Sequence, residues 1–369
     1  MTEVLWQYDP VAFQRELIVD DRELSAVVAR LSPDSAIGVD LEMAQRVERK
    51  PGGIQEWKQV LALIQIASHE YSVVIDPVRC RDLTPLKPLL AGKTRKVFLG
   101  GGQDAALLEK AGIPARNIVD VGEVALAIFG RRQDGMAALA ERIFGISLDK
   151  SVRRADWLAR PLNPVLLAYA HRDAELTLLI YDWFRLNYPE VSALHEREIL
   201  DPVLPAVTPA WLKDAFDRAA ADAVAVVMEH DLDPARDSGP LAEDVRAALK
   251  ESCAPRQMSR LLRIAGELGL RDVLPDVLPL VDSPSSVIRG AAARAIGQLA
   301  DRQTGGPILK QLKADPIDDV KKAAEAGQRD LKAQGKAVPV AEADEEPQSS
   351  LGDNALSALR QLMAQMGEE

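Results

Sequence analysis

The sequence predicts an α/β domain followed by an all-α region, and three observations support this prediction. Short apolar runs bounded by polar turns, which indicate strands, occur in the first half of the chain and alternate with runs of helical spacing. Residues 210–335 show helical spacing almost throughout. Within that part, one motif recurs at a spacing of 33 residues, as in stacked helical repeats.

The first half should form one domain, at residues 1–190, built on a mixed sheet flanked by helices. Strands are expected at 36–43, 60–67, 72–75, 96–99 and 118–120. Helices are expected at 15–30, 82–90, 105–111, 121–129, 135–144 and 164–186. Polar residues around Pro51-Gly52-Gly53 predict a loop at 44–58, and residues 191–209 should form a hinge.

The second half, at residues 210–335, contains the repeat. The segment Asp282–Ala291 recurs in type as Asp315–Ala324. This signature resembles HEAT-like repeats, which are helix pairs that bury their apolar faces by stacking on neighbours. Residues 336–353 are polar and acidic, which predicts a disordered linker. Residues 354–369 return to helical spacing and predict an amphipathic helix that docks on this protein or binds a partner.

Composition limits the class of protein. The chain has 369 residues, a formal net charge of −11 and two cysteines, Cys80 and Cys253. Two cysteines are too few for a disulfide framework, and we find no signal peptide and no apolar run long enough to span a membrane, so we expect a cytoplasmic protein. Residues 1–190 hold 24 Lys and Arg against 26 Asp and Glu, a net charge of −2, so the acidity lies mostly in the second half. The basic clusters at 93–96, 131–132 and 153–160 are phosphate contacts or ordinary solvated surface.

Two carboxylates lie in the first expected strand. Asp40 and Glu42 are residues i and i+2, so they project from the same face of an otherwise apolar strand. Like charges this close are costly unless a cation lies between them. Oxygen-only ligands favour Mg²⁺ or Mn²⁺ over zinc. The pair is therefore a candidate metal site, although most such pairs, taken alone, are not.

Two further acids are candidates for the same site. Tyr169 and Asp173 are four residues apart in the expected helix at 164–186 and so share one face; taken alone, they indicate a surface contact. Asp104 follows Gly100-Gly101-Gly102 at an expected helix start, where an aspartate most often caps the helix. No Gly-Lys-Ser/Thr follows these glycines, which excludes a phosphate-binding P-loop.

The order of these motifs resembles the ribonuclease D family, the tyrosine-bearing branch of the DEDD exonucleases. Asp-x-Glu in the first strand, a single Asp after a middle strand and Tyr-x3-Asp in a late helix follow the family pattern over residues 15–186. The segments Leu63–Ile66 and Asp149–Ala170 also resemble motifs of the family. We therefore expect a ribonuclease H-like sheet in the first domain.

The resemblance implies a 3′-5′ exonuclease with two Mg²⁺ or Mn²⁺ ions held by Asp40, Glu42, Asp104 and Asp173. Tyr169 would orient or help to deprotonate the attacking water, and the products would be nucleoside 5′-monophosphates. The expected substrate contacts are Ile64 and Gln65 to the terminal base or sugar, and Lys150 and Arg160 to the phosphates.

Two features depart from the family. Leu99 lies five residues before the third acid, where the family usually carries His or Asn, and we expect altered substrate handling or a lower rate rather than loss of metal binding. Helical repeats replace the nucleic-acid-binding domains that ribonuclease D proteins commonly carry. The expected partner is nucleic acid with a single-stranded 3′ end, RNA favoured, and the repeats or the last helix could bind a protein. DNA as the substrate, or a catalytically weak scaffold, are the alternatives.

Overall fold

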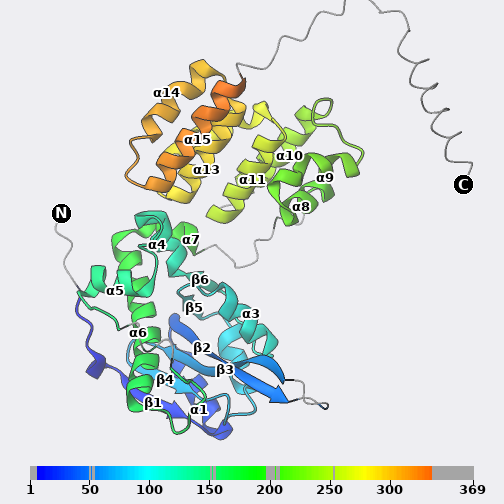
Figure 1. Cartoon of the computed structure of the whole chain (residues 1–369). Coiled ribbons are helices and arrows are strands. Elements are labelled where there is room, and N and C mark those ends of the chain that lie inside the picture. The colour runs from blue at the N-terminus through cyan, green and yellow to red at the C-terminus, as the bar shows by residue number, and fades with distance from the viewer. Residues whose placement is uncertain are drawn as a thin grey trace, which may run out of the picture. The chain divides into compact units, whose positions relative to one another are not determined.

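The computed structural model describes residues 6–334 apart from gaps at 50, 52–54, 150–151, 153–154, 197–203, 205–207 and 252–253, so the predicted linker and last helix lie outside the described residues. Its first part is built on a mixed sheet with the strand order β1-β4-β3-β2-β5-β6 (Figure 1). The strands are β1 Gln14–Ile18, β2 Ala36–Arg49, β3 Gln55–Ala67, β4 Tyr71–Ile75, β5 Arg95–Phe98 and β6 Ile118–Asp120. Strand β3 is antiparallel to β2 and β4, whereas the remaining neighbours are parallel.

Helices cover both faces of this sheet, as expected for the ribonuclease H-like α/β fold. They are α1 Leu24–Leu31, α2 Lys87–Ala91, α3 Gly102–Lys110, α4 Val121–Phe129, α5 Met136–Phe144, α6 Pro164–Asn187 and α7 Pro189–His195. Buried side chains of α1, α2 and α3 share one apolar cluster with β2, β3 and β4. Those of α4, α5 and α6 form a second cluster with β5 and β6. The predicted fold class is confirmed.

Two predicted elements are wrong. The start of the helix expected at 15–30 is strand β1, and helix α1 begins only at Leu24. The buried Leu24, Val27 and Leu31 supply the helical spacing, which concealed the preceding edge strand. The loop expected at 44–58 is a two-stranded ribbon, because β2 runs to Arg49 and β3 begins at Gln55. Most of its described side chains are exposed on both faces, so the sequence lacks the alternation of apolar and polar residues by which strands are recognised.

The second part of the chain is helical among the described residues. Its helices are α8 Ala210–Asp217, α9 Ala223–Glu229, α10 Ser238–Glu251, α11 Pro255–Glu267, α12 Leu274–Val277, α13 Ser286–Leu299, α14 Arg302–Leu312 and α15 Asp318–Gln334. Helices α13 and α15 pack backbone to backbone, because a methyl group at Gly297 would overlap Gly327. Arg289 of α13 forms a 2.7 Å ion pair with Asp315, which lies in the segment before α15. Residues of the repeated motif thus link successive repeats.

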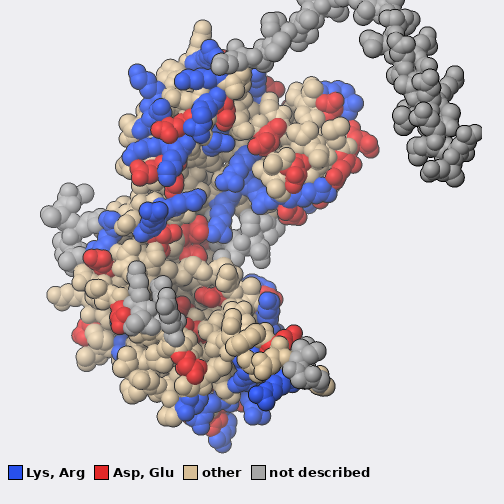
Figure 2. Space-filling view, viewed as in Figure 1, with Lys and Arg blue, Asp and Glu red and all other residues tan. Residues whose placement is uncertain are grey.

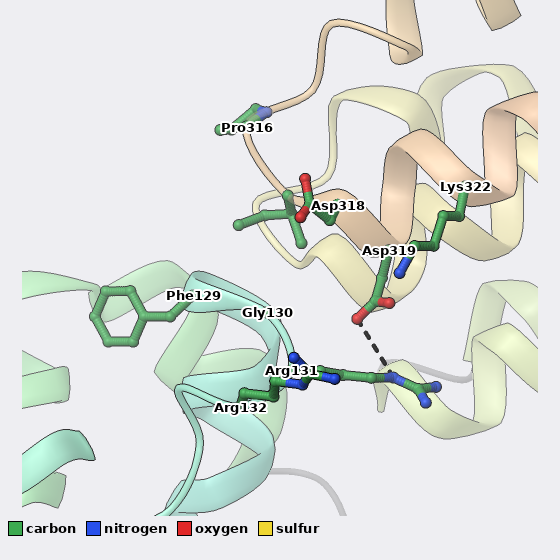
Figure 3. A pocket seen from close by; sticks show the side chains of 9 residues that line it. Phe129, Gly130, Arg131, Arg132, Pro316, Asp318, Asp319 and Lys322 are labelled. Atoms are coloured by element: carbon green, nitrogen blue, oxygen red, sulfur yellow. Dashed lines mark ion pairs between the residues drawn. The ribbon is translucent and has the colours of Figure 1, made fainter.

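Residues 1–332 form one compact unit, so the sheet-containing part and the helical part of the chain are in contact. Arg131, after α4, lies 3.4 Å from Asp319 of α15. Both residues line a pocket that Lys322 and Arg132 also border (Figure 3). No helix in the described part of the chain is both long enough and apolar enough to cross a membrane.

Candidate active site

Three carboxylates meet between the sheet and its longest helix. Asp40 and Glu42 project from one face of β2, and Asp173 comes from α6. One oxygen of each lies within 4.8 Å of the other two. The helix can approach because residue 38 is glycine: a methyl group there would overlap the backbone oxygen of Ala174. The missing side chain on β2 thus brings Asp173 to the strand acids.

Burial and mutual repulsion dominate the electrostatics of this group. Burial first, and then the charges of Asp173, Glu42 and Asp104, raise the pKa of Asp40 well above its ordinary value. The three other expected acids therefore all act on Asp40. Carboxylates held this close are stabilised by a divalent cation, and an all-oxygen donor set suits Mg²⁺ or Mn²⁺. These residues fit the ion that the sequence predicts.

Asp104 contributes from a third element. It lies in the first turn of α3, whose N-cap is Gly101, so it is not the capping residue. Its carboxylate is outside the group within 4.8 Å but close enough to affect Asp40. Burial, and then the charge of Asp120, raise the pKa of Asp104 to about 6. Asp120 itself accepts hydrogen bonds from the N–H groups of Gly100 (2.9 Å) and Gly101 (3.0 Å) and so fixes the turn before α3.

Tyr169 is buried one helical turn before Asp173 on α6. Its ring lies 6.0 Å from that of Trp157, centroid to centroid. The guanidinium of Arg172 lies 5.1 Å from the same ring, and its Nε is 3.9 Å from Asp173. These contacts hold the phenol in a defined position beside the carboxylates.

Arg160 is engaged inside the domain. Its guanidinium donates two hydrogen bonds to the buried Asp76, at 2.5 and 2.8 Å. It also donates to the carbonyl oxygens of Trp157 (2.7 Å), Ala159 (2.9 Å) and Ala62 (3.2 Å). This arrangement fastens the segment that carries Trp157 to the end of β4. The phosphate contact expected of Arg160 remains a prediction, made for a side chain whose donors already have partners.

The other expected substrate contacts differ in accessibility. Ile64 is fully buried in the cluster on the α1 side of the sheet. Gln65 is paired with Asp40 across β2 and β3. It too is fully buried, and neither its amide nitrogen nor its amide oxygen has a hydrogen-bond partner among the described residues. Lys150 lies outside the described residues. The substrate contacts of all three residues remain predictions.

Sequence reasoning missed a network that fixes α6. Glu175 is fully buried and accepts hydrogen bonds from Arg15 Nε (2.9 Å) and Nη2 (2.7 Å) and from the Tyr8 hydroxyl (2.5 Å). A glutamate two residues after Asp173 on an apolar helix was a signal, but its partners precede it by 160 or more residues.

Two further residues near the site have packing roles. His171 is buried, with its Nδ1 2.8 Å from the Ser72 hydroxyl. Burial, above all, lowers its pKa to about 4. Leu99 is partly buried and packs against the cluster formed by α4, α5 and α6.

Two family models match the two parts of this chain. Residues 16–188 match the family model of 3′-5′ exonucleases, and residues 242–327 match that of HEAT repeats. Ribonuclease D of Zymomonas mobilis is 36% identical over 161 residues, which cover 42% of this chain and 39% of that protein. Ribonuclease D of Escherichia coli is 30% identical over 161 residues, with coverages of 43% and 40%. The matched region is thus well under half the length of these relatives.

The solved structure of Escherichia coli RNase D aligns with 96% of this chain and 85% of its own, at 19% identity and a TM-score of 0.44. The family matches cover both the nuclease domain and the repeats. Residues 16–188 therefore contain a 3′-5′ exonuclease domain related to ribonuclease D, and HEAT repeats follow this domain.

Proposed function

We propose that this domain removes nucleotides one at a time from single-stranded 3′ ends by metal-dependent hydrolysis, with RNA as the preferred polymer. The observation that carries the proposal is the meeting of Asp40, Glu42 and Asp173 within 4.8 Å, beside Tyr169. A divalent cation stabilises carboxylates held this close, and the matching family of 3′-5′ exonucleases carries out the hydrolysis that such a cation can assist.

Asp40, Glu42, Asp104 and Asp173 would hold the metal, with Asp40 between the others. Two Mg²⁺ or Mn²⁺ ions, when bound, activate a water for attack on the terminal phosphodiester and stabilise the leaving 3′ oxygen. The position of Asp173 relative to the acids of β2 depends on the close backbone packing of α6 against Gly38. The products would be nucleoside 5′-monophosphates.

Tyr169 would position the attacking water. Its hydroxyl can both donate and accept a hydrogen bond, and its ring contacts Trp157 and the guanidinium of Arg172. A fixed phenol next to the carboxylates aligns the water with the phosphorus and shares in the removal of its proton.

RNA is favoured over DNA because the relatives at 30–36% identity are named ribonuclease D. DNA trimming is the alternative with the same chemistry. The alternative of a weak scaffold rests on Leu99, which offers no hydrogen bond where the family usually has one.

The test uses 3′-labelled RNA and DNA oligonucleotides of one sequence, with Mg²⁺, with Mn²⁺ and with EDTA. We expect the release of mononucleotides from the 3′ end, with RNA the better substrate. Asp173→Asn should lower the rate by about a hundredfold or more, because it removes a carboxylate from the cluster. Asp182→Asn is the matched control, since Asp182 lies on the same helix but pairs with His69 at 2.7 Å.

Three results would contradict the proposal. Failure to release nucleotides from either polymer with both metals would rule out an active exonuclease. Hydrolysis that persists in EDTA would rule out the metal-dependent mechanism. Faster trimming of DNA than of RNA would overturn the substrate preference alone.

A further inference from the structure

Gln65 lies on β3, on the face of the sheet that carries the acids. Its neighbours Ile64 and Ile66 belong to the apolar cluster on the α1 side. Because side chains alternate along a strand, Gln65 points to the opposite side, toward α6. The register agrees, since Gln65 pairs with Asp40 on β2 and with Val74 on β4, and Val74 packs with residues of α6. Gln65 and Asp40 are thus cross-strand neighbours on one face, at the Cβ separation of about 5 Å that such pairs have.

The amide of Gln65 is closed off from water and has no hydrogen-bond partner within the described part of the chain. The side chain is fully buried, and both Nε2 and Oε1 lack a partner there. Charged side chains, by contrast, are spread over the surface that Figure 2 shows, where water satisfies them. A buried amide without hydrogen bonds destabilises a folded protein, so native structures rarely contain one. This exception points to a partner that arrives with a ligand.

The other polar side chains on this side of β4 are already engaged. The hydroxyl of Ser72 lies 2.8 Å from Nδ1 of His171. The carboxylate of Asp76, just after β4, accepts two hydrogen bonds from Arg160, at 2.5 and 2.8 Å. Among the strand neighbours of the buried amide this leaves the acids of β2, and Asp40 is the acid directly opposite.

A carboxylate that binds a metal ion is commonly held in place by a further hydrogen bond from a neighbouring group. In the proposed function, Asp40 holds Mg²⁺ or Mn²⁺ between the other acids. The amide nitrogen of Gln65 is a donor on the adjacent strand, and the amide oxygen can accept a hydrogen bond from a water. A carboxylate that must keep one orientation and a buried donor that needs an acceptor therefore lie side by side.

We propose that Gln65 is a positioning residue of the metal site: its amide nitrogen donates a hydrogen bond to the carboxylate of Asp40 and fixes the orientation in which Asp40 binds the ion. This inference rests on the metal site of the proposed function and deepens it, because it assigns Gln65 to that site rather than to the terminal base or sugar. Full burial, which closes the side chain to a nucleotide, supports this assignment. Removal of the amide should weaken metal binding without destabilising the fold.

The test replaces the amide with apolar groups in the full chain and measures Mn²⁺ binding by titration calorimetry, without nucleic acid. Gln65→Met keeps the length of the side chain, and Gln65→Leu guards against a packing effect of one replacement. Both variants should raise the Kd for Mn²⁺ by about ten- to a hundredfold. In EDTA, their melting temperatures should equal or exceed that of the wild type, because a buried amide without partners has been removed.

Ser72→Ala is the matched control, because it removes a buried polar group from the same face of the next strand. Its loss leaves Nδ1 of His171 buried without this partner, so the melting temperature in EDTA should fall. The Kd for Mn²⁺ should remain that of the wild type. General damage to the fold cannot produce these opposite patterns, and an equal loss of Mn²⁺ affinity in Ser72→Ala would overturn the inference.

Two further results would also overturn it. One is an unchanged Kd for Mn²⁺ in both Gln65 variants, and the other is a lower melting temperature of both in EDTA, which would show that the amide already has a partner.

Trimming of an oligonucleotide separates this role from contact with the substrate. In Gln65→Met the Mn²⁺ concentration at half the maximal rate should rise, whereas the KM for the oligonucleotide at saturating Mn²⁺ should stay the same. A raised KM with an unchanged Mn²⁺ requirement would assign Gln65 to the substrate instead. Calorimetry needs no turnover, so a wild-type chain that binds Mn²⁺ but hydrolyses nothing would refute the proposed function alone.

Discussion

Replacing Gly38 with alanine should separate the two elements that carry the acids. The added methyl group would lie well inside 3.0 Å of the Ala174 carbonyl oxygen, a separation that real Cβ atoms essentially never show, and at 3.0 Å from the Leu178 nitrogen. Both neighbours are backbone atoms of α6, which cannot rotate away. The helix would have to shift by roughly 1 Å, and Asp173 would move with it, away from Asp40.

The Gly38→Ala variant should lose both stability and activity. Overpacking of this kind costs about 1–3 kcal/mol of unfolding free energy, which urea denaturation followed by circular dichroism measures. A displacement of catalytic groups by about 1 Å costs on the order of a hundredfold in rate, measured as nucleotide release at saturating Mg²⁺. The activity loss should therefore greatly exceed what partial unfolding explains.

Gly290→Ala in α13 is the matched control. The nearest neighbour that a methyl group would meet there is the Cβ of Ala323, at an ordinary contact distance of 3.8 Å, so this helix position should gain about 0.5–1 kcal/mol of stability and keep full activity. If Gly38→Ala retained wild-type stability and rate, the close approach of α6 to β2 would not be what assembles the site.

Three other perturbations test other parts of the structure. Arg15→Met should lower the unfolding free energy by about 3 kcal/mol, because it leaves the carboxylate of Glu175 buried with one partner fewer; a loss below about 1 kcal/mol in urea denaturation would contradict this. Burial, and then Arg256, lower the pKa of His195 to about 4, so the unfolded state binds the proton more tightly. The unfolding free energy should therefore fall between about pH 6.5 and pH 4, by up to about 3 kcal/mol, and His195→Leu should reduce this slope; equal slopes would show that His195 is not responsible. Gly297→Ala should lower the melting temperature by forcing α13 from α15, whereas an unchanged melting temperature would contradict their backbone contact.

The candidate acids were predictable because their spacing is local. Asp40 and Glu42 are two residues apart on a strand, and Tyr169 and Asp173 are four apart on a helix, so each pair reveals a shared face without knowledge of the fold. The two faces can meet because residue 38 is glycine. The sequence alone does not reveal this role, because it depends on the packing of α6 against β2.

Other features depend on partners that are distant in sequence. The sequence predicts a phosphate contact for Arg160 because this residue is basic and lies in a family motif. In the structure its guanidinium binds Asp76, which lies 84 residues earlier. The sequence predicts a loop at the ribbon of β2 and β3 because the exposed faces of this ribbon carry no alternation of apolar and polar residues. The register of β2 and β3 shifts between Glu42 and Met43, and no local pattern in the sequence indicates this shift.

The anchoring of Glu175 has a consequence for where the nuclease domain begins. Sequence similarity to the family starts at residue 16, but Tyr8 and Arg15 lie before that point and hold the buried carboxylate. Trp6 adds a hydrogen bond from its backbone nitrogen to the Ile143 oxygen, at 2.9 Å. A truncation at residue 16 would therefore remove both partners of Glu175 and leave its buried negative charge uncompensated in α6, the helix that carries Asp173. The folding unit is longer than the evolutionary signature that identifies it.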